Sequence, residues 1–445
     1  MSMTTPICDF ARRYAERDAL RLHMPGHKGA GFLGVEQWDI TEIDGADSLY
    51  EAAGIIRESE DNASALFGAP TFYSTEGSSQ CIRAMLYLVA LHAKKQGKRP
   101  FILAGRNAHK TFLSAVALLD VEVEWLLPQE GESYLSCKVS AEDVAARLSA
   151  MGEKPTAVYL TSPDYLGNVA DVAAIAAVCR RYGVLLVVDN AHGAYLRFLQ
   201  PSRHPMDLGA DMCCDSAHKT FPVLTGGAYL HVREEFASQC KNALQLFGST
   251  SPSYLIMESL DGANAYLADG YREKLAAFAE KVQTLKERLA AQGYTLQGDE
   301  PMKVTIAAKG YGYTGEELAA VLLEKENIVC EFADRDFMVL MLTPEIGEEG
   351  LQRLENVLCA VEKKAAIEEV PPVFHACTPV MSVREAMLSP SETVTVEEGI
   401  GRVLAAASVG CPPAVPIVVC GERIDSEAAA CFAYYGIKTC AVVAQ

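Results

Sequence analysis

The chain has 445 residues, of which half are hydrophobic and 22% are charged, as in ordinary globular proteins. Domains cluster near ~100–200 residues, so a chain of this length is expected to form two or three of them. A formal net charge of −19 excludes the basic surfaces that nucleic acids and anionic membranes require; it is compatible with a cationic substrate and most simply keeps the protein soluble.

The sequence contains no recognisable targeting signal and no cysteine pattern typical of disulfide or metal sites. No apolar run reaches the ~18 residues of a membrane helix, and the N-terminus lacks the basic stretch and apolar core of a secretory signal. The fourteen cysteines are scattered, with no CxxC pair and no Cys/His spacing typical of metal sites. The sequence therefore predicts a soluble cytoplasmic protein with reduced thiols and no metal.

Short apolar runs alternate with helical patterns from about Thr71 to Val232. The predicted strands are Phe101–Ala104, Val121–Leu127, Thr156–Thr161, Val184–Asp189 and Ala228–Val232, and the clearest helices are Ser78–Gln96 and Asp171–Tyr182. This alternation predicts an α/β fold with a mostly parallel sheet flanked by helices on both faces. The run that ends at Asp189 is apolar without alternation, as a central buried strand should be.

The pattern changes after Leu260. Apolar residues at intervals of three and four predict a long helix that connects domains: Leu275, Phe278, Val282, Leu285 and Leu289. A strand–helix–strand–helix unit follows, and Pro371–Pro372 marks a linker. The predicted division is an N-terminal segment (1–60), a large domain (61–270), a small α+β domain (271–370) and a C-terminal domain (371–445).

Two motifs in the large domain point to a bound ligand. Glu76–Ser79 leads from a strand into a helix, and its glycine, hydroxyls and free N–H groups can bind phosphate, although such turns are common. His109 follows a strand and begins a helix. Its flat ring could stack on a cofactor, and the alternative is a capping or core histidine.

Asp189 lies at the carboxyl end of the predicted central strand, where open α/β sheets bind ligands. A buried carboxylate needs a partner, and a protonated pyridine nitrogen is a suitable one because the pair keeps the ring cationic. The alternative, a helix N-cap, agrees equally well with this residue taken alone.

Lys219 follows a short predicted strand, Asp211–Cys214, and lies beside His218 and hydroxyl groups. Desolvation at a strand end lowers the pKa of an amine enough for attack on an aldehyde, whereas an isolated lysine is usually a solvated surface charge. A phosphate loop, an aromatic ring, an acid and a lysine follow one another on one α/β domain. Together they predict a pyridoxal-phosphate (PLP) enzyme with a Schiff base on Lys219.

The sequence resembles the bacterial ornithine/lysine/arginine decarboxylases, which are fold-type-I PLP enzymes, over nearly the whole chain. The segments that carry the resemblance are LHMPGHKGAGF (22–32), TEIDGADSLYEAAGIIRESEDNASALFGA (41–69), RNAHK, SPDYLGNVADVAAIAAVCRRYG, VDNAHGAY, SAHKT and STSPSYLIMESLD (249–261). The resemblance implies that the PLP phosphate, ring, substrate and aldehyde are held by Gly77, Ser78 and Ser79 (phosphate), His109 (ring stacking), Asp189 (pyridine nitrogen), His192 (beside the cofactor), Ser216 (phosphate), His218 (substrate) and Lys219 (Schiff base). It also implies a homodimer with shared active sites, with Ser249–Tyr254 and Met24–Lys28 as candidate shared segments.

The chain departs from the family pattern at several positions. Asn190 and Tyr195 stand where the family usually has an acidic residue and a histidine. In the tail, Cys411 and Ala414 change the proline-rich stretch within Gly410–Ile424, and the receiver-like N-terminal domain of the large members is absent. These changes leave the cofactor residues in place and the substrate open.

The predicted function is decarboxylation of arginine, lysine or ornithine to a polyamine-type amine and CO2, with Lys219 or His218 returning the proton. The alternatives are a class-V aminotransferase or cysteine desulfurase, which typically carry D-x-A-Q at Asp189–His192, and a PLP-binding homologue without this activity. Lys309–Gly315 imitates a dinucleotide GxGxxG motif. Thr314 and Glu317 explain that motif as a capping box, so we predict no nucleotide site there.

Overall fold

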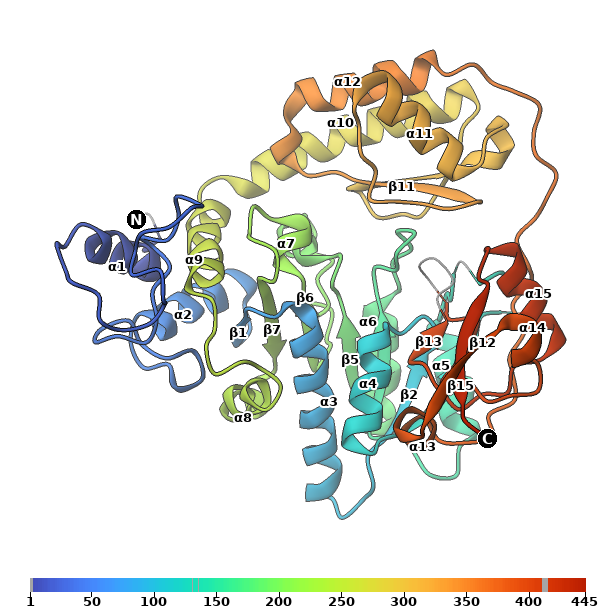
Figure 1. Cartoon of the computed structure of the whole chain (residues 1–445), viewed down its shortest axis with the longest axis horizontal. Coiled ribbons are helices and arrows are strands. Elements are labelled where there is room, and N and C mark those ends of the chain that lie inside the picture. Colours follow the sequence, from blue (N-terminus) through green and yellow to red (C-terminus); the bar gives the residue numbers. More distant parts are fainter. Residues whose placement is uncertain (1–2, 130, 135, 410–414) are drawn as a thin grey trace. The chain divides into compact units, whose positions relative to one another are not determined.

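The computed structural model describes residues 3–129, 131–134, 136–409 and 415–445. The chain forms two compact units, the first built from the residues up to Lys98 together with Leu185–Lys274, and the second from Arg99–Val184 and Leu275–Gln445. Figure 1 shows the chain with many of their elements labelled. The domain boundaries near residues 60, 270 and 370 stay a prediction.

The main sheet has seven strands in the order β1-β7-β6-β5-β4-β2-β3. Their bounds are β1 (Thr71–Ser74), β2 (Phe101–Gly105), β3 (Glu122–Leu126), β4 (Ala157–Thr161), β5 (Leu185–Asp189), β6 (Met212–Asp215) and β7 (Ala228–Val232). The pairs β2–β3, β2–β4 and β5–β6 are parallel, and β7 runs antiparallel to both β1 and β6. The predicted α/β fold with a mostly parallel sheet is confirmed.

The first unit carries β1, β5, β6 and β7 with helices that precede and follow these strands in the chain. These helices are α1 (Pro6–Ala15), α2 (Ile55–Phe67), α3 (Gly77–Lys95), α7 (Ala217–Thr220), α8 (Glu234–Gln245) and α9 (Tyr254–Ala268), with 3-10 turns η1 (Leu49–Glu51) and η2 (Ala194–Phe198). Helix α2 ends because Gly68 takes a left-handed φ of +72°, which lets the chain turn directly into β1. Val187 and Val188 in β5 are at most 1% exposed, as the unalternating apolar run predicts.

In the second unit, β2–β4 alternate with α4 (Lys110–Leu119), α5 (Ala141–Ala150) and α6 (Val172–Tyr182). Helix α5 begins at a capping box in which Ser140 and Asp143 satisfy each other's backbone N–H groups. Helix α6 begins with Asp171 accepting from a backbone N–H and ends at Gly183, whose φ is +67°. The local sequence therefore sets both ends of these crossover helices.

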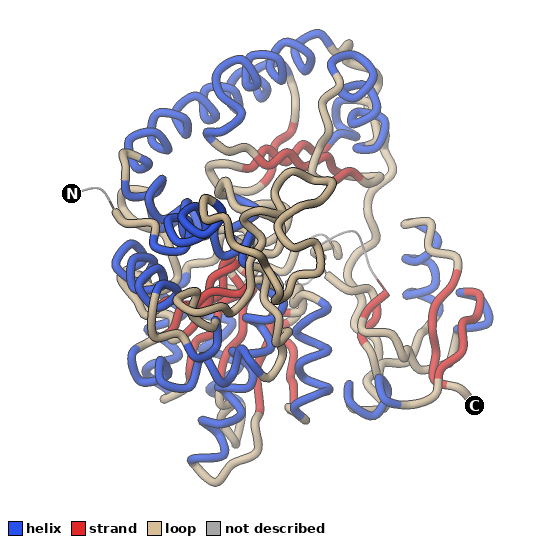
Figure 2. The backbone as a smooth tube through the Cα atoms, turned by 60° about the vertical axis from the view of Figure 1, so that its left-hand side comes forward, coloured by secondary structure: helices blue, strands red, loops and turns tan. Residues whose placement is uncertain are grey.

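A smaller antiparallel sheet follows in the second unit, in the order β10-β11-β9-β8. Its elements are α10 (Tyr271–Gln292), β8 (Thr295–Gln297), β9 (Lys303–Ala307), η3 (Ala308–Tyr311), α11 (Gly315–Glu326), β10 (Phe332–Ala333), β11 (Phe337–Met341), η4 (Pro344–Ile346) and α12 (Gly347–Ala360). Figures 1 and 2 show α10, α11 and α12 on one face of this sheet. The capping box of Thr314 and Glu317 is present, and the sheet is antiparallel throughout, so the GxGxxG run is explained without a nucleotide.

The C-terminal part of the second unit is a small region of short helices and short strands. It contains α13 (Val383–Leu388), β12 (Ser391–Thr395), α14 (Val396–Gly399), β13 (Ser408–Val409), β14 (Val418–Val419), α15 (Ser426–Tyr434) and β15 (Thr439–Val443). A buried ion pair joins it to the segment after β2: Arg106 Nη2 lies 2.8 Å from Glu422 Oε2. The altered tail residues Gly410–Ala414 lie outside the described residues.

No helix among the described residues is long and apolar enough to cross a membrane.

Candidate functional site

The start of α3 forms a candidate anion site in the first unit. Gly77 has a φ of +71°, and a Cβ there would meet nothing within 4 Å, so its backbone is open on that side. Ser216 Oγ donates to Ser78 Oγ at 2.9 Å, which brings hydroxyls from two predicted phosphate ligands together. The N-cap residue Glu76 makes no side-chain cap at this positive end of a 19-residue helix, and Ser79 belongs to its first turn.

Asp189 ends β5 and is 2% exposed. Its Oδ1 accepts from the backbone N–H of Ala191 at 3.2 Å and from the Cys214 thiol at 3.6 Å. No helix begins at Asp189, and its carboxylate instead accepts from a backbone N–H at a turn, so its role toward a pyridine nitrogen stays a prediction. The next helical turn, η2, begins only at Ala194 and has Gly193 as its N-cap.

Lys219 lies in α7, a single turn after β6, and its Nζ is 3.0 Å from Nε2 of His192. His192 comes from the segment after β5 and is 6% exposed. The half-buried lysine amine therefore contacts an imidazole rather than bulk water alone. This brings the predicted Schiff-base lysine and the predicted cofactor histidine together.

His218 precedes that lysine and has a defined tautomer. Its Nδ1 lies 2.9 Å from the carbonyl oxygen of Gly227, which can only accept, so Nδ1 carries the proton and donates it. Burial lowers the pKa of His218, and the nearby charge of Lys219 adds to that effect. The side chain is therefore a neutral imidazole near pH 7 with a lone pair on Nε2.

His109 belongs to the second unit and is the N-cap of α4. Its Nδ1 accepts from the backbone N–H of Thr111 at 3.2 Å. The capping alternative is thus what the structure has. Capping uses one ring nitrogen and leaves the stacking role a prediction.

Sequence reasoning missed a buried charged cluster next to these residues. Asp215 Oδ2 lies 3.1 Å from Nε2 of His204 and 3.1 Å from Nε2 of His231, and all three side chains are 0% exposed. Asp215 Oδ1 accepts from the side-chain amide of Asn190 at 2.6 Å. No linear spacing could reveal it, because its members come from β6, β7 and two loops. The only available signal was an acidic residue directly before the Ser-Ala-His-Lys run.

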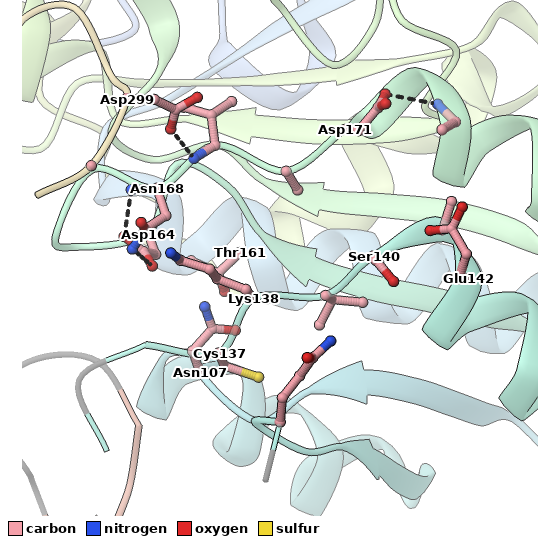
Figure 3. Close-up of a pocket in the computed structure, with 17 residues that line it drawn as sticks. Asn107, Cys137, Lys138, Ser140, Glu142, Thr161, Asp164, Asn168, Asp171 and Asp299 are labelled. Atoms are coloured by element: carbon pink, nitrogen blue, oxygen red, sulfur yellow. Dashed lines mark hydrogen bonds between the residues drawn. The ribbon is translucent and has the colours of Figure 1, made fainter. Parts of the chain in front are cut away.

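The second unit has a polar cavity of its own, of about 530 Å³, at the carboxyl ends of β2 and β4 (Figure 3). Asn107, which is 8% exposed and two residues before His109, lines it. The charged groups along its wall are mostly acidic: Glu142, Asp164, Asp171 and Asp299 against Lys138. Acidic and amide groups thus gather at a sheet edge of the kind that binds ligands in open α/β folds.

The two segments predicted to be shared in a dimer both lie in the first unit. Ser253 caps α9, and the backbone N–H of Ser249 donates to Glu76 Oε1 at 2.5 Å, beside the start of α3. The stretch around Met24–Lys28 exposes large apolar side chains, namely Leu20 (84%), Leu22 (83%), Met24 (61%), Phe32 (105%) and Leu33 (82%).

These features fit PLP. An open, glycine-lined helix start with two serines suits a phosphate, a buried strand-end carboxylate suits a pyridinium, and a lysine beside an imidazole suits an aldehyde. The fold and the site together define an α/β enzyme class that uses PLP.

Comparisons with known proteins agree. Residues 5–300 match the major domain of the Orn/Lys/Arg decarboxylases, and residues 362–440 match their C-terminal domain. The chain is 30% identical over 96% of its length to an uncharacterized Bacillus subtilis protein, YaaO, of which it covers 93%. It is 28% identical over 95% of its length to an arginine decarboxylase of the same organism, covering 92% of it. The lysine decarboxylase LdcF of Francisella novicida has the same fold, with a TM-score of 0.78 at 15% identity over 99% of this chain and 81% of that one.

The chain therefore belongs to the Orn/Lys/Arg decarboxylase family. It has the fold-type-I architecture, and it is a PLP-dependent amino-acid decarboxylase. This membership favours the decarboxylase over the predicted aminotransferase and desulfurase alternatives.

Proposed function

We propose that the protein decarboxylates arginine, giving the corresponding amine and CO2, and that lysine and ornithine are poorer substrates. The observation that carries the proposed active site is the contact between Lys219 Nζ and His192 Nε2 at 3.0 Å, in the unit that also holds the buried carboxylate of Asp189. The preference for arginine rests on relatives described as arginine decarboxylases that align over nearly the whole chain.

Each side chain has a role in holding the cofactor. Lys219 would bind the PLP aldehyde carbon through Nζ, and Asp189 would accept from the pyridine nitrogen. The phosphate would be held by Gly77, Ser78, Ser79 and Ser216, and His109 and His192 would flank the ring. When bound, PLP supplies an electron sink that lowers the barrier to breaking the bond between Cα and the carboxylate.

The protein's own contribution is orientation and proton transfer. The carboxylate of Asp189 is buried away from water. In such a low-dielectric environment, an anion stabilises positive charge on a ring nitrogen more strongly than it would in solvent. His218 has its proton on Nδ1, directed to a carbonyl oxygen, so Nε2 acts as an acceptor toward the substrate. We therefore assign the return of the proton to Cα to Lys219 Nζ, with His192 Nε2 as its partner.

We propose a cytoplasmic homodimer in which the partner completes the site. The exposed apolar stretch between Leu20 and Leu33 supports this, because monomeric proteins rarely leave so many large apolar side chains in water together. Two segments are the candidates for residues shared between subunits: Met24–Lys28, which lies within this stretch, and Ser249–Tyr254.

The test of the cofactor assignment is Lys219→Ala, with Lys94→Ala, an exposed lysine at the end of α3, as the matched control. The visible absorbance of the protein-bound cofactor should disappear in Lys219→Ala and remain in the control, because only the former loses the covalent link. Survival of that absorbance in Lys219→Ala would refute the assignment.

The test of the activity is incubation of the PLP-loaded protein with arginine, lysine and ornithine. CO2 and amine are then measured by mass spectrometry. We expect equal amounts of the two products, with the highest kcat/KM for arginine. A keto acid or a persulfide product would contradict the reaction type, and a preference for lysine or ornithine would contradict only the substrate.

A further inference from the structure

A closed network of charged groups lies beneath the carboxyl ends of β5 and β6. Asp215 is its centre, and His204 and His231 both direct Nε2 at the same carboxylate oxygen, each at 3.1 Å. None of the three side chains is exposed, and the mechanism above uses none of them. A buried charge is costly unless it is paired and hydrogen-bonded. The positions of the protons on the two histidines therefore determine how this network is stabilised.

The proton positions on His231 follow from its neighbours. Thr71 Oγ1 lies 2.9 Å from the carbonyl oxygen of Ala69 and 2.9 Å from His231 Nδ1, so its hydroxyl can donate to the ring nitrogen as an acceptor. Burial lowers the pKa of His231, although the carboxylate of Asp215 opposes that effect. Nε2 faces a carboxylate oxygen of Asp215, which can only accept, so this ring carries its proton on Nε2 and donates it.

His204 has the same tautomer as His231. The backbone N–H of Met206 can only donate, and it points at His204 Nδ1 over 3.4 Å. Nδ1 is therefore the acceptor, and Nε2 carries the single proton of a neutral imidazole and gives it to Asp215. Both imidazoles thus donate from Nε2 to one oxygen of a single buried carboxylate.

Cys213 also lies close, with its Sγ 3.9 Å from His204 Nε2, and burial raises the pKa of its thiol well above the ordinary value. For Asp215, burial alone would raise the carboxyl pKa, but the two imidazoles outweigh burial and hold it well below its usual range. Two N–H donors that share one carboxylate oxygen therefore hold the network together.

One hydrogen bond links this network to the proposed active site. Asp215 Oδ1 can only accept, so it dictates that Asn190 points its NH2 group inward, at 2.6 Å. Asn190 is fully buried, and its own Oδ1 has no hydrogen-bond partner among the described residues. The bond to Asp215 is therefore what fixes the orientation of this amide. Asn190 directly follows Asp189, and Asp215 directly precedes Ser216.

We propose that Asp215, fixed by His204 and His231, is a positioning residue that locks the ends of β5 and β6 together through Asn190. The lock sets the relative placement of Asp189 and His192 on one segment and of Ser216 and Lys219 on the other. This inference rests on the proposed role of those residues as the cofactor site. It adds a buried ionic support to the backbone pairing of β5 with β6 and to the contacts of Cys214 with Asp189 and of Lys219 with His192.

The test is Asp215→Asn in the full chain loaded with PLP. The introduced amide is the same size and can donate as well as accept, so Asn190 is free to turn over. We expect kcat to fall on the order of tenfold with KM nearly unchanged, because small misplacements of reacting groups cost rate rather than affinity. The visible circular dichroism of bound PLP, which reports the orientation of the ring, should lose intensity.

The matched control is Asp211→Asn at the opposite end of β6. Asp211 is 8% exposed and accepts from Leu186 N–H and Arg233 Nη1, each at 2.7 Å, so it is an equally engaged buried carboxylate away from the site. This control should lower the melting temperature and leave kcat and the visible circular dichroism unchanged. Equal losses in both variants would reduce Asp215 to a structural residue and overturn the proposal.

A second variant keeps the proposal testable if Asp215→Asn does not fold. Asn190→Ala removes the link without touching the carboxylate and should reproduce the loss of circular dichroism. The double variant should be no worse than either single one, because both break the same connection. Additive losses would overturn the proposal, and so would one equivalent of zinc in the purified parent protein.

Circular dichroism needs bound PLP but no turnover, so a parent that binds PLP yet forms no amine would refute the proposed function alone.

Discussion

Removing the buried carboxylate of Glu422 should be one of the most destabilising single substitutions in the second unit. Arg106 is 1% exposed, and Glu422 Oε2 is its ion-pair partner at 2.8 Å. The Nε and Nη1 atoms of Arg106 are buried with no hydrogen-bond partner among the described residues, so the charge has little other compensation. Glu422→Gln keeps the shape and strands the guanidinium, which costs about 3–5 kcal/mol in comparable buried pairs.

The assay is urea denaturation followed by tryptophan fluorescence. The chain has two tryptophans, and Trp125 lies in the second unit with its ring 5.3 Å from the Arg106 guanidinium carbon. A Trp38→Phe background leaves Trp125 as the reporter of this region. The free energy of unfolding should fall by about 3–5 kcal/mol at constant m-value.

Two controls separate burial from charge. Glu124→Gln breaks the exposed pair with Arg147 and should cost at most about 1 kcal/mol. The double change Arg106→Met with Glu422→Leu should recover most of the lost stability, because it removes both charges from the interior. A loss below about 1 kcal/mol for Glu422→Gln would show that water reaches this pair and would refute the argument.

Three further outcomes follow from the structure. Burial raises the pKa of Glu258 to about 8, so its neutral form stabilises the folded protein at pH 4, and that contribution is lost as the pH rises through 8. In thermal melts, Glu258→Gln should therefore have the same melting temperature as the parent near pH 4 and a higher one at pH 9. Ser140→Ala removes the cap of α5 and should lower the free energy of unfolding by about 1 kcal/mol, measured by denaturant titration, whereas no change would mean that water replaces the cap. Phe32→Asp should shift the proposed homodimer toward monomer in analytical ultracentrifugation, and an unchanged dimer would place the interface elsewhere.

The amino-acid sequence by itself determined the α/β class, the main strands and helices, and the chemistry of the large domain. Periodicity and capping are local properties, so β5 was predictable from an unalternating apolar run, and α11 from the spacing of Thr314 and Glu317. The order of the glycine–serine turn, the strand-end acid and the lysine indicated PLP, because each residue type matches one part of that molecule.

Only the tertiary structure decided how side chains far apart in the sequence contact each other. It showed that no helix starts at Asp189, and it gave His109 the capping bond that the sequence had left as one of two alternatives. It also brought Asp215 against two histidines from separate segments and paired Arg106 with Glu422, 316 residues away. Contacts of this kind depend on which strands lie side by side and how deeply they are buried, and neither is a property of any local stretch of sequence.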